Sequence, residues 1–184
     1  MVQGVAIEDG SLININPATG ELISKVPCSN PAEIAAMVKT ANEAQTTWAA
    51  TKVQNRVHLL RRCLKAMAAI KDEFARLIVQ EMGKPIQEAC DEMDFSIDKE
   101  EFLTILEQSL LPQKFGNSVV LRQPLGVVAI ISPWNFPVGE IILLVLPSLA
   151  SGNSGKPPFF AILHTDCALA ILIDAFSLAC WKQS

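Results

Sequence analysis

One segment carries most of the structural information in this chain, namely Pro124-Leu-Gly-Val-Val-Ala-Ile-Ile-Ser-Pro-Trp-Asn-Phe-Pro137. Residues 127–132 form an apolar run that ends at Ser132, and such a run predicts a buried strand. Pro133 and Pro137 each fix φ and remove a backbone donor, so we expect the loop between them to be stiff. The apolar residues 138–150 are typical of a helix without a solvent-facing side. A stiff loop between strand and helix is where α/β folds bind ligands.

Two side chains of this loop suit ligand binding. Trp134 offers a large flat surface, and Asn135 offers a neutral amide with two N–H donors. The sequence therefore places its candidate site between the expected strand and the expected helix.

Three motifs in order resemble the aldehyde dehydrogenase superfamily. Residues 124–137, followed by Leu146-Pro-Ser-Leu-Ala-Ser-Gly-Asn153, carry the resemblance most strongly, and Ile15-Asn-Pro-Ala-Thr-Gly20 and Glu81-Met-Gly-Lys-Pro85 extend it toward the N-terminus. The resemblance implies an α/β fold, in which N-terminal helices lead into the first strand and helix of a Rossmann-like coenzyme domain. Within these residues that fold is expected to be incomplete.

The chain departs from the family pattern after Asn153. The family continues with a second strand ending in Lys-Pro-Ser, whereas this chain reads Gly152-Asn-Ser-Gly-Lys-Pro-Pro158. We therefore expect a family-like coenzyme-binding portion over residues 1–153 and a non-family hydrophobic tail over residues 154–184. A frameshift, a splice variant and a gene-model error would each produce this junction. Two aspartates within the apolar tail argue against a membrane span.

The resemblance also implies roles for individual residues. Asn135 corresponds to the asparagine that stabilises the oxyanion of the reacting aldehyde, and the alternative is that its side chain only pins the loop through backbone hydrogen bonds. Ile131, Ser132, Pro133 and Trp134 correspond to the lining of the cofactor cleft. The cofactor would be NAD or NADP, and the sequence leaves the choice between them open.

The catalytic nucleophile and base of the family are missing from this sequence. The family cysteine lies in Gly-Gln-x-Cys and the base glutamate in Glu-Leu-Gly-Gly, and neither string occurs in the 184 residues. Cys167 is not expected to replace the cysteine. Lys156 is a candidate for the family lysine that contacts the adenosine ribose, but it arrives two positions early and precedes Pro157 and Pro158, which disfavours the match. We expect a dehydrogenase truncated before its catalytic cysteine and inactive alone. The alternative is a non-catalytic isoform or a hetero-oligomeric partner of a full-length paralogue, held at membranes or chaperones by its tail.

Composition excludes several other classes. A net charge of −4 gives no basis for nucleic-acid binding. The five cysteines are widely spaced and odd in number, which favours reduced thiols and predicts no metal site. The N-terminus has neither a basic start nor an apolar core, so we expect a cytoplasmic protein. The substrate would be an aldehyde, whose identity the sequence does not give.

Hydrophobic spacing predicts three helices before the loop. The first is capped by Ser29 or Asn30, and the third covers residues 86–110. The second covers residues 54–82 with an interruption at Asp72, and Gly83 with Pro85 is expected to end it. Residues 1–28 are expected to form short strands and turns. Residues 119–122 are expected to form an edge strand or hairpin. The third helix carries an acidic face that we expect to be solvated surface, made of Glu88, Asp91, Glu92, Asp94 and Asp98.

Overall fold

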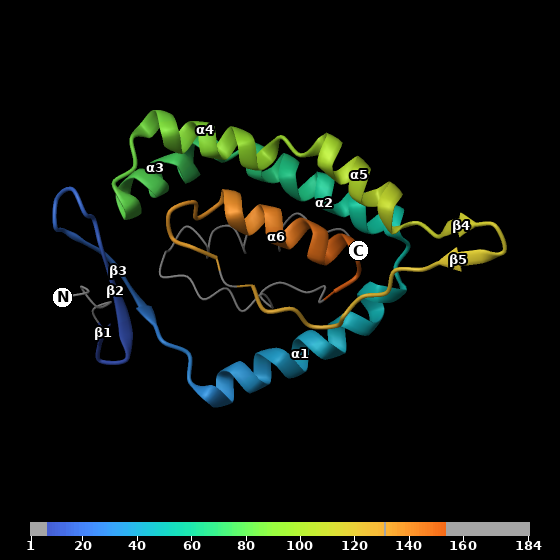
Figure 1. The fold of residues 1–184 in the computed structure, drawn as a ribbon. Helices are drawn as coiled ribbons and strands as arrows, with labels where there is room; N and C mark the ends of the chain where they lie inside the picture. The colour runs from blue at the N-terminus through green and yellow to red at the C-terminus, as the bar shows by residue number, and fades with distance from the viewer. Residues whose placement is uncertain (1–6, 131, 154–184) are drawn as a thin grey trace.

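The computed structural model describes residues 7–130 and 132–153. Figure 1 shows α6, the last helix of the described residues, lying between α1 and a layer formed by α2 to α5. The elements are the strands β1 (Ile7–Glu8), β2 (Ser11–Ile15), β3 (Leu22–Pro27), β4 (Gln113–Phe115) and β5 (Ser118–Val120), and the helices α1 (Pro31–Ala50), α2 (Val53–Ala68), α3 (Lys71–Met82), α4 (Ile86–Ile97), α5 (Glu100–Leu110) and α6 (Gly139–Ala150).

The N-terminal strands form an antiparallel sheet in the order β1-β2-β3. Asn14, a buried residue of β2, donates from its side chain to Glu81 Oε1 at 3.1 Å and so ties this sheet to α3. The strands and turns expected at the N-terminus are therefore confirmed over the described residues.

The start of α1 follows the sequence prediction. Asn30 Oδ1 accepts hydrogen bonds from the backbone N–H groups of Ala32 and Glu33 at 2.9 and 3.0 Å. The Glu33 carboxylate accepts in return from the Asn30 N–H at 2.9 Å, which completes a capping box. Pro31 occupies the first turn, where its missing donor costs nothing.

Each of the two long helical segments is divided in two. The segment predicted at residues 54–82 breaks at Ala69 and Ile70, just before the interruption expected at Asp72. The segment predicted at residues 86–110 breaks at Asp98 and Lys99. Gly83 ends α3 in the left-handed conformation at φ +70, as its type predicts. After these breaks α2, α4 and α5 each contact α6, whereas α3 packs against α4.

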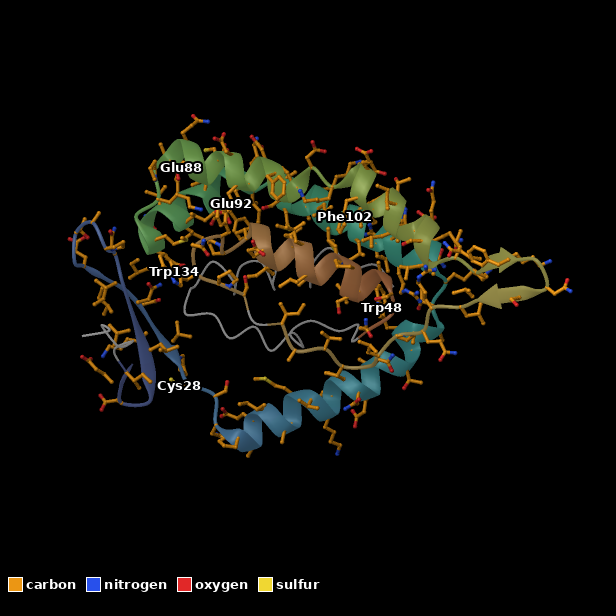
Figure 2. All side chains as sticks on the ribbon, in the orientation of Figure 1. Cys28, Trp48, Glu88, Glu92, Phe102 and Trp134 are labelled. Carbon is orange, nitrogen blue, oxygen red and sulfur yellow. The ribbon has the colours of Figure 1, made fainter. Side chains whose placement is uncertain are left out.

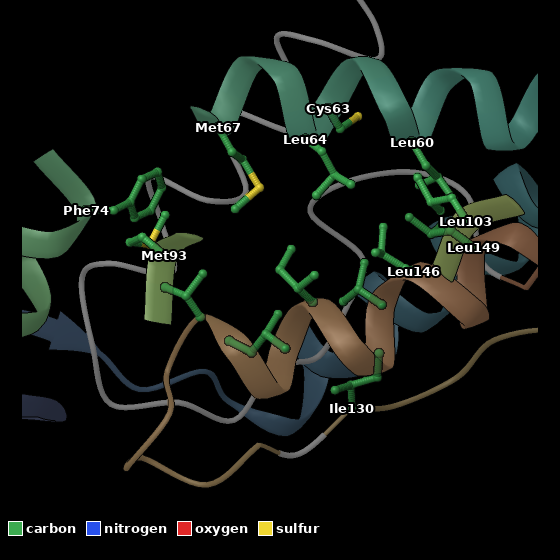
Figure 3. Packing of buried hydrophobic residues seen from close by; sticks show 14 of the residues in the cluster. Leu60, Cys63, Leu64, Met67, Phe74, Met93, Leu103, Ile130, Leu146 and Leu149 are labelled. Atoms are coloured by element: carbon green, nitrogen blue, oxygen red, sulfur yellow. The ribbon is translucent and has the colours of Figure 1, made fainter. Parts of the chain in front are cut away.

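The core is built around α6, which contacts α2, α4 and α5. Its apolar face packs against the inner faces of those helices, and Figure 3 shows this packing from close by. The fully buried members with the largest side chains are Val57, Leu60, Met67, Phe74, Ile78, Met93, Leu103, Val138, Ile141, Ile142 and Leu146. The helix predicted at residues 138–150 is present as Gly139–Ala150 and is mostly buried, but Leu144 is 42% exposed, so the prediction that it has no solvent-facing side is wrong.

The strand predicted at residues 127–132 is not present in the described residues. Residues 127–130 and Ser132 belong to no strand, although Ile130 and Ser132 are buried as the apolar pattern required. A strand exists only where another strand completes its hydrogen-bond ladder, and none of the described strands pairs here. The predicted strand is therefore absent from the described residues. Among the described residues of the run, the predicted burial holds at Ile130 and Ser132 only, because Val127 and Val128 are half-buried and Ala129 is exposed.

The hairpin expected near residues 119–122 is confirmed in shortened form. Strand β5 pairs antiparallel with β4 across a turn at Gly116, while Leu121 and Arg122 lie beyond the strand. Cys28 and Cys90 are free thiols, but Cys63 is disulfide-bonded, so the expectation of reduced thiols is wrong at that position. The tail, residues 154–184, lies outside the described residues.

Candidate functional site

The loop between Ser132 and α6 exposes four consecutive residues, and three of them follow Pro133. Trp134 is 68% exposed, Phe136 is 48% exposed and Asn135 is also exposed. The loop is anchored on either side of them by buried residues, Ser132 before and Pro137 after. A loop fixed at its ends and exposed at its centre presents these three side chains to solvent.

The side-chain amide of Asn135 has no hydrogen-bond partner among the described residues. Its backbone carbonyl, in contrast, accepts a hydrogen bond from Lys84 Nζ at 2.9 Å. Another residue therefore holds the main chain at this position, and the amide remains available. This arrangement disfavours the alternative that Asn135 only pins the loop with its own side chain.

Glu92 corrects the prediction of an entirely solvated acidic face on α4. Its side chain is only 1% exposed and forms a 2.6 Å ion pair with Lys84, whose side chain is 10% exposed. The other carboxylate oxygen accepts from the backbone N–H groups of Val138 and Gly139 at 2.9 and 3.0 Å. These are donors at the start of α6, where a helix lacks internal acceptors and the dipole favours a negative charge. The remaining members of that face are exposed or half-buried.

Lys84 connects this carboxylate to the loop. It lies in the short connection between Gly83, which ends α3, and Pro85, which precedes α4. Its ammonium group donates to Glu92 and to the Asn135 carbonyl, and it lies 4.2 Å from the centre of the Phe136 ring. Both Lys84 and Glu92 therefore act on the exposed loop from neighbouring elements. Figure 2 shows Glu92 and Glu88 on α4, with Trp134 on the loop.

A cavity of about 560 Å³ lies beside the loop. Its walls come from α4, from the start of α6, and from Lys84 and Phe136. The lining residues are Lys84, Glu88, Asp91, Glu92, Phe95, Phe136, Gly139, Glu140 and Leu143. A cavity of this size can hold a small organic molecule.

The opposite end of α6 is also fixed by charged and polar groups. The buried guanidinium of Arg56 donates to the Ala150 carbonyl at 2.9 Å and to the carbonyls of Ala49 and Thr51. Burial lowers the pKa of Arg56 from its ordinary value. Trp48 Nε1 donates to the Leu149 carbonyl at 2.9 Å. Helix α6 is therefore held at both ends, and the loop before it starts from a fixed point.

The sequence-predicted cofactor residues fall into three groups. Pro133 and Trp134 are exposed, as ligand contact requires, whereas Ser132 is buried and its hydroxyl makes only a 3.4 Å contact with the Pro133 carbonyl. Ile131 lies outside the described residues. Lys156 and Cys167 lie outside them as well.

Sequence reasoning missed Lys84 and Glu92 as members of the site. Lys84 was noted only within a helix-ending motif, and Glu92 was assigned to the surface. A usable signal existed, because Glu92 shares one helical face with the buried residues Ala89, Met93 and Ser96. A charge on an apolar face requires a partner, and the pattern alone does not say which.

Two negative observations concern only the part of the chain that the structure describes. There, no three His, Cys, Asp or Glu side chains cluster as metal ligands would. Nor is any helix of residues 7–130 and 132–153 both long and apolar enough to cross a bilayer.

Comparison with known sequences identifies related proteins. Residues 5–158 match the aldehyde dehydrogenase family. An NADP(+) succinate-semialdehyde dehydrogenase of Deinococcus radiodurans is 33% identical over 157 residues, covering 83% of this chain and 33% of the relative. A mitochondrial succinate-semialdehyde dehydrogenase of Arabidopsis thaliana is 36% identical over 151 residues, covering 78% of this chain and 29% of the relative. The chain thus spans about a third of the length of these relatives.

Solved structures agree with the sequence relatives. A succinate-semialdehyde dehydrogenase from Burkholderia pseudomallei superposes with a TM-score of 0.75 at 30% identity, covering 91% of this chain and 36% of that one. An NAD-dependent benzaldehyde dehydrogenase from Corynebacterium glutamicum gives a TM-score of 0.80 at 26% identity, covering 94% of this chain and 39% of that one. The expected partial α/β fold is therefore confirmed.

Proposed function

Because this chain belongs to the aldehyde dehydrogenase family, we propose that it supplies the aldehyde-binding asparagine of an NAD(P)-dependent oxidation of an aldehyde to a carboxylic acid. Asn135 is the residue that carries the proposal. The observation that supports it is the separation of roles at this position, where Lys84 holds the backbone carbonyl and the amide is exposed without a partner among the described residues.

The chemistry requires a donor of this type. Attack of a nucleophile on an aldehyde moves negative charge onto the carbonyl oxygen, and a fixed N–H donor stabilises that charge. An amide donates without protonating the intermediate, so Asn135 stabilises the oxyanion and leaves it able to collapse. In an enzyme with all its catalytic groups, loss of one such donor lowers kcat about 10²–10³-fold.

The exposed residues before Asn135 fit contact with a nucleotide cofactor only in part. Pro133 and Trp134 form an exposed apolar surface, whereas the buried Ser132 can reach a ligand only through its backbone. NAD or NADP, when bound, supplies the hydride acceptor of the reaction. The part that these residues play is to bind and orient it.

These 184 residues on their own are expected to bind an aldehyde without oxidising it. They contain neither the Gly-Gln-x-Cys string of the family nucleophile nor the Glu-Leu-Gly-Gly string of the base. Oxidation needs both a thiolate that attacks the carbonyl and a base that activates water. Purified chain should therefore reduce neither NAD nor NADP with simple aldehydes.

The cavity is lined by Phe136, the neighbour of Asn135, and not by Asn135 itself, and we propose that it receives the tail of an aldehyde bound at Asn135. Glu88, Asp91 and Glu140 contribute carboxylates, and no cation among the described residues forms an ion pair with them. The one lysine of the lining is already paired with Glu92. A carboxylate-tailed aldehyde would meet like charges here, so an uncharged or cationic tail is favoured.

Nuclear magnetic resonance can test the role of Asn135 in the chain as it stands. Butyramide is a suitable probe, because it carries a carbonyl oxygen yet does not react with lysines. The side-chain amide signals of Asn135, identified by their loss in Asn135→Ala, should move as butyramide is added. Those of Asn117, exposed in the β4–β5 turn, serve as the internal control and should stay still. If the Asn135 signals do not shift at butyramide concentrations up to about 100 mM, the proposal is refuted, because the free energy of butyramide binding would then be very small.

The same titration tests the preference for charge. Succinamate adds a carboxylate tail to the probe and 4-aminobutanamide adds an ammonium tail. The ammonium compound should bind more tightly than succinamate at low salt, and the difference should shrink as salt screens the cavity. Equal affinities would show that the three carboxylates do not select the tail.

A further inference from the structure

The buried carboxylate of Glu92 accepts hydrogen bonds from three donors, which belong to two different parts of the fold. One oxygen of Glu92 accepts from the Val138 and Gly139 N–H groups at the start of α6, and the other accepts from Lys84 at 2.6 Å. Both lone-pair-bearing oxygens are therefore in use. Because the side chain is almost completely shielded from water, each of these bonds is stronger than its exposed counterpart.

Lys84 continues the connection to the loop. The Lys84 ammonium group also donates a hydrogen bond to the Asn135 carbonyl at 2.9 Å, and it lies over the Phe136 ring. The ammonium group is fixed by Glu92, so the point at which it holds the Asn135 peptide is fixed as well. The start of α6, Glu92, Lys84 and the exposed loop thus form one hydrogen-bonded chain.

We propose that Glu92 and Lys84 are positioning residues, which hold the Asn135 peptide so that its side-chain amide is oriented before a carbonyl ligand arrives. This inference rests on the function proposed for Asn135. An oxyanion donor is effective to the degree that it needs no reorganisation when charge develops. The side-chain amide of Asn135 lies on an exposed loop and has no hydrogen-bond partner among the described residues. The hydrogen bond from Lys84 to the Asn135 backbone carbonyl fixes the main chain from which that amide extends.

Stability alone does not account for this pair. A buried ion pair is often no more stabilising than an apolar pair of similar size, because both charges lose their hydration. What the charges provide here is direction, because Glu92 fixes where the Lys84 ammonium lies and the ammonium fixes one carbonyl. The exposed pair of Lys71 and Asp94 has the same 2.6 Å separation but no contact with the loop among the described residues, and it provides a matched control.

The test compares Lys84→Met with Lys71→Met in the full chain. Lys84→Met keeps most of the side-chain volume and removes the donor. The backbone order parameter of the Phe136 amide should fall from about 0.85 to below about 0.6 in this variant. Butyramide affinity, followed at the Asn135 side-chain amide, should fall about tenfold to a hundredfold, as expected for loss of a charge-assisted hydrogen bond. Lys84→Arg, which retains charge and donors, should restore most of both, and Lys71→Met should change neither.

The two measurements separate the two proposals. If butyramide leaves the wild-type Asn135 signals unmoved, the proposed function fails, while the order parameter still decides whether Lys84 holds the loop. If Lys84→Met keeps both the Phe136 order parameter and butyramide affinity within twofold of wild type, the positioning role is refuted. Should Lys84→Met fail to fold, the neutral isostere Glu92→Gln replaces it, with the same loss of order expected at Phe136 and the same unchanged result refuting the role.

Discussion

The two ends of α6 are held by side chains of opposite charge, which connect the helix to different parts of the molecule. At the start, the Glu92 carboxylate accepts from two backbone N–H groups, and at the end the Arg56 guanidinium donates to the Ala150 carbonyl. Each charge matches the helix dipole at its end and satisfies backbone groups that the helix leaves unpaired. Both charged groups are buried, so neither end depends on solvent for its partners.

The difference lies in where the remaining bonds go. Arg56 gives its other donors to carbonyls at the end of α1, a purely internal connection. Glu92 binds Lys84, which in turn holds the exposed loop beside the cavity. The end of α6 therefore secures the helix in the core, and its start transmits that fixed position to a surface that can meet a ligand. Substitutions at the two ends should then separate stability from loop order.

The largest effect is expected at Arg56. Arg56→Met removes the donor from the buried Ala150 carbonyl and from the half-buried carbonyls of Ala49 and Thr51, and should lower the free energy of unfolding by about 3–5 kcal/mol. Chemical denaturation measures the loss. In the fraction that remains folded, the Phe136 order parameter should stay unchanged. Loosening of the loop by this variant would contradict the separation of the two ends.

Glu92→Gln should cost less stability and affect the loop more. The amide retains an acceptor for the α6 N–H groups but loses its charge, so the unfolding free energy should fall by about 2–3 kcal/mol. Hydrogen exchange at the Val138 and Gly139 amides should accelerate, and Phe136 should become more mobile. An exchange rate at those two amides equal to that of the wild type would show that the carboxylate does not secure the start of the helix.

Trp48→Phe measures how much a neutral hydrogen bond contributes at the C-terminal end of α6. The substitution removes the Nε1 donor to the Leu149 carbonyl while it keeps an aromatic ring. One neutral hydrogen bond contributes about 1 kcal/mol, and the unsatisfied carbonyl adds to the loss, so we expect a decrease of about 1–2 kcal/mol in unfolding free energy. Denaturation of Trp48→Phe alongside Arg56→Met measures it. A loss as large as that of Arg56→Met would mean that the indole, and not the guanidinium, anchors this end.

The smallest effect concerns Lys99, a buried lysine that lacks a carboxylate partner of the kind Lys84 has. Its ammonium group bonds to the Phe95 carbonyl, and burial lowers its pKa, with the charge of Asp98 opposing the shift. The folded state therefore releases this proton at lower pH than the unfolded state does. Between the two pKa values the unfolded chain holds more protons, so stability gains as pH rises. Relative to Lys99→Met, wild-type stability should increase as the pH rises toward 10.5, the ordinary pKa of lysine, and a decrease would contradict the assigned direction.

Local signals predicted the fold where the cause is local. The Asn30 cap, the Gly83 stop and the apolar helix after Pro137 each depend on a few neighbouring residues, and each was predicted. The strand predicted at residues 127–132 is absent from the described residues, because a strand depends on partners elsewhere in a sheet. The site followed the same rule. The exposure of Trp134 and Asn135 follows from the proline-bounded loop, whereas the bonds of Glu92 and Arg56 join residues 46 and 94 positions apart.

A double-mutant cycle tests most directly the claim that Glu92 and Lys84 act on Asn135 as one unit. Butyramide affinity would be measured for wild type, Glu92→Gln, Lys84→Met and the double variant. Because either single change breaks the same connection, the double variant should bind about as weakly as the weaker single one, with a coupling of about 1 kcal/mol or more. If the two losses simply add, the residues act independently and the proposed connection from α6 to the Asn135 amide is contradicted.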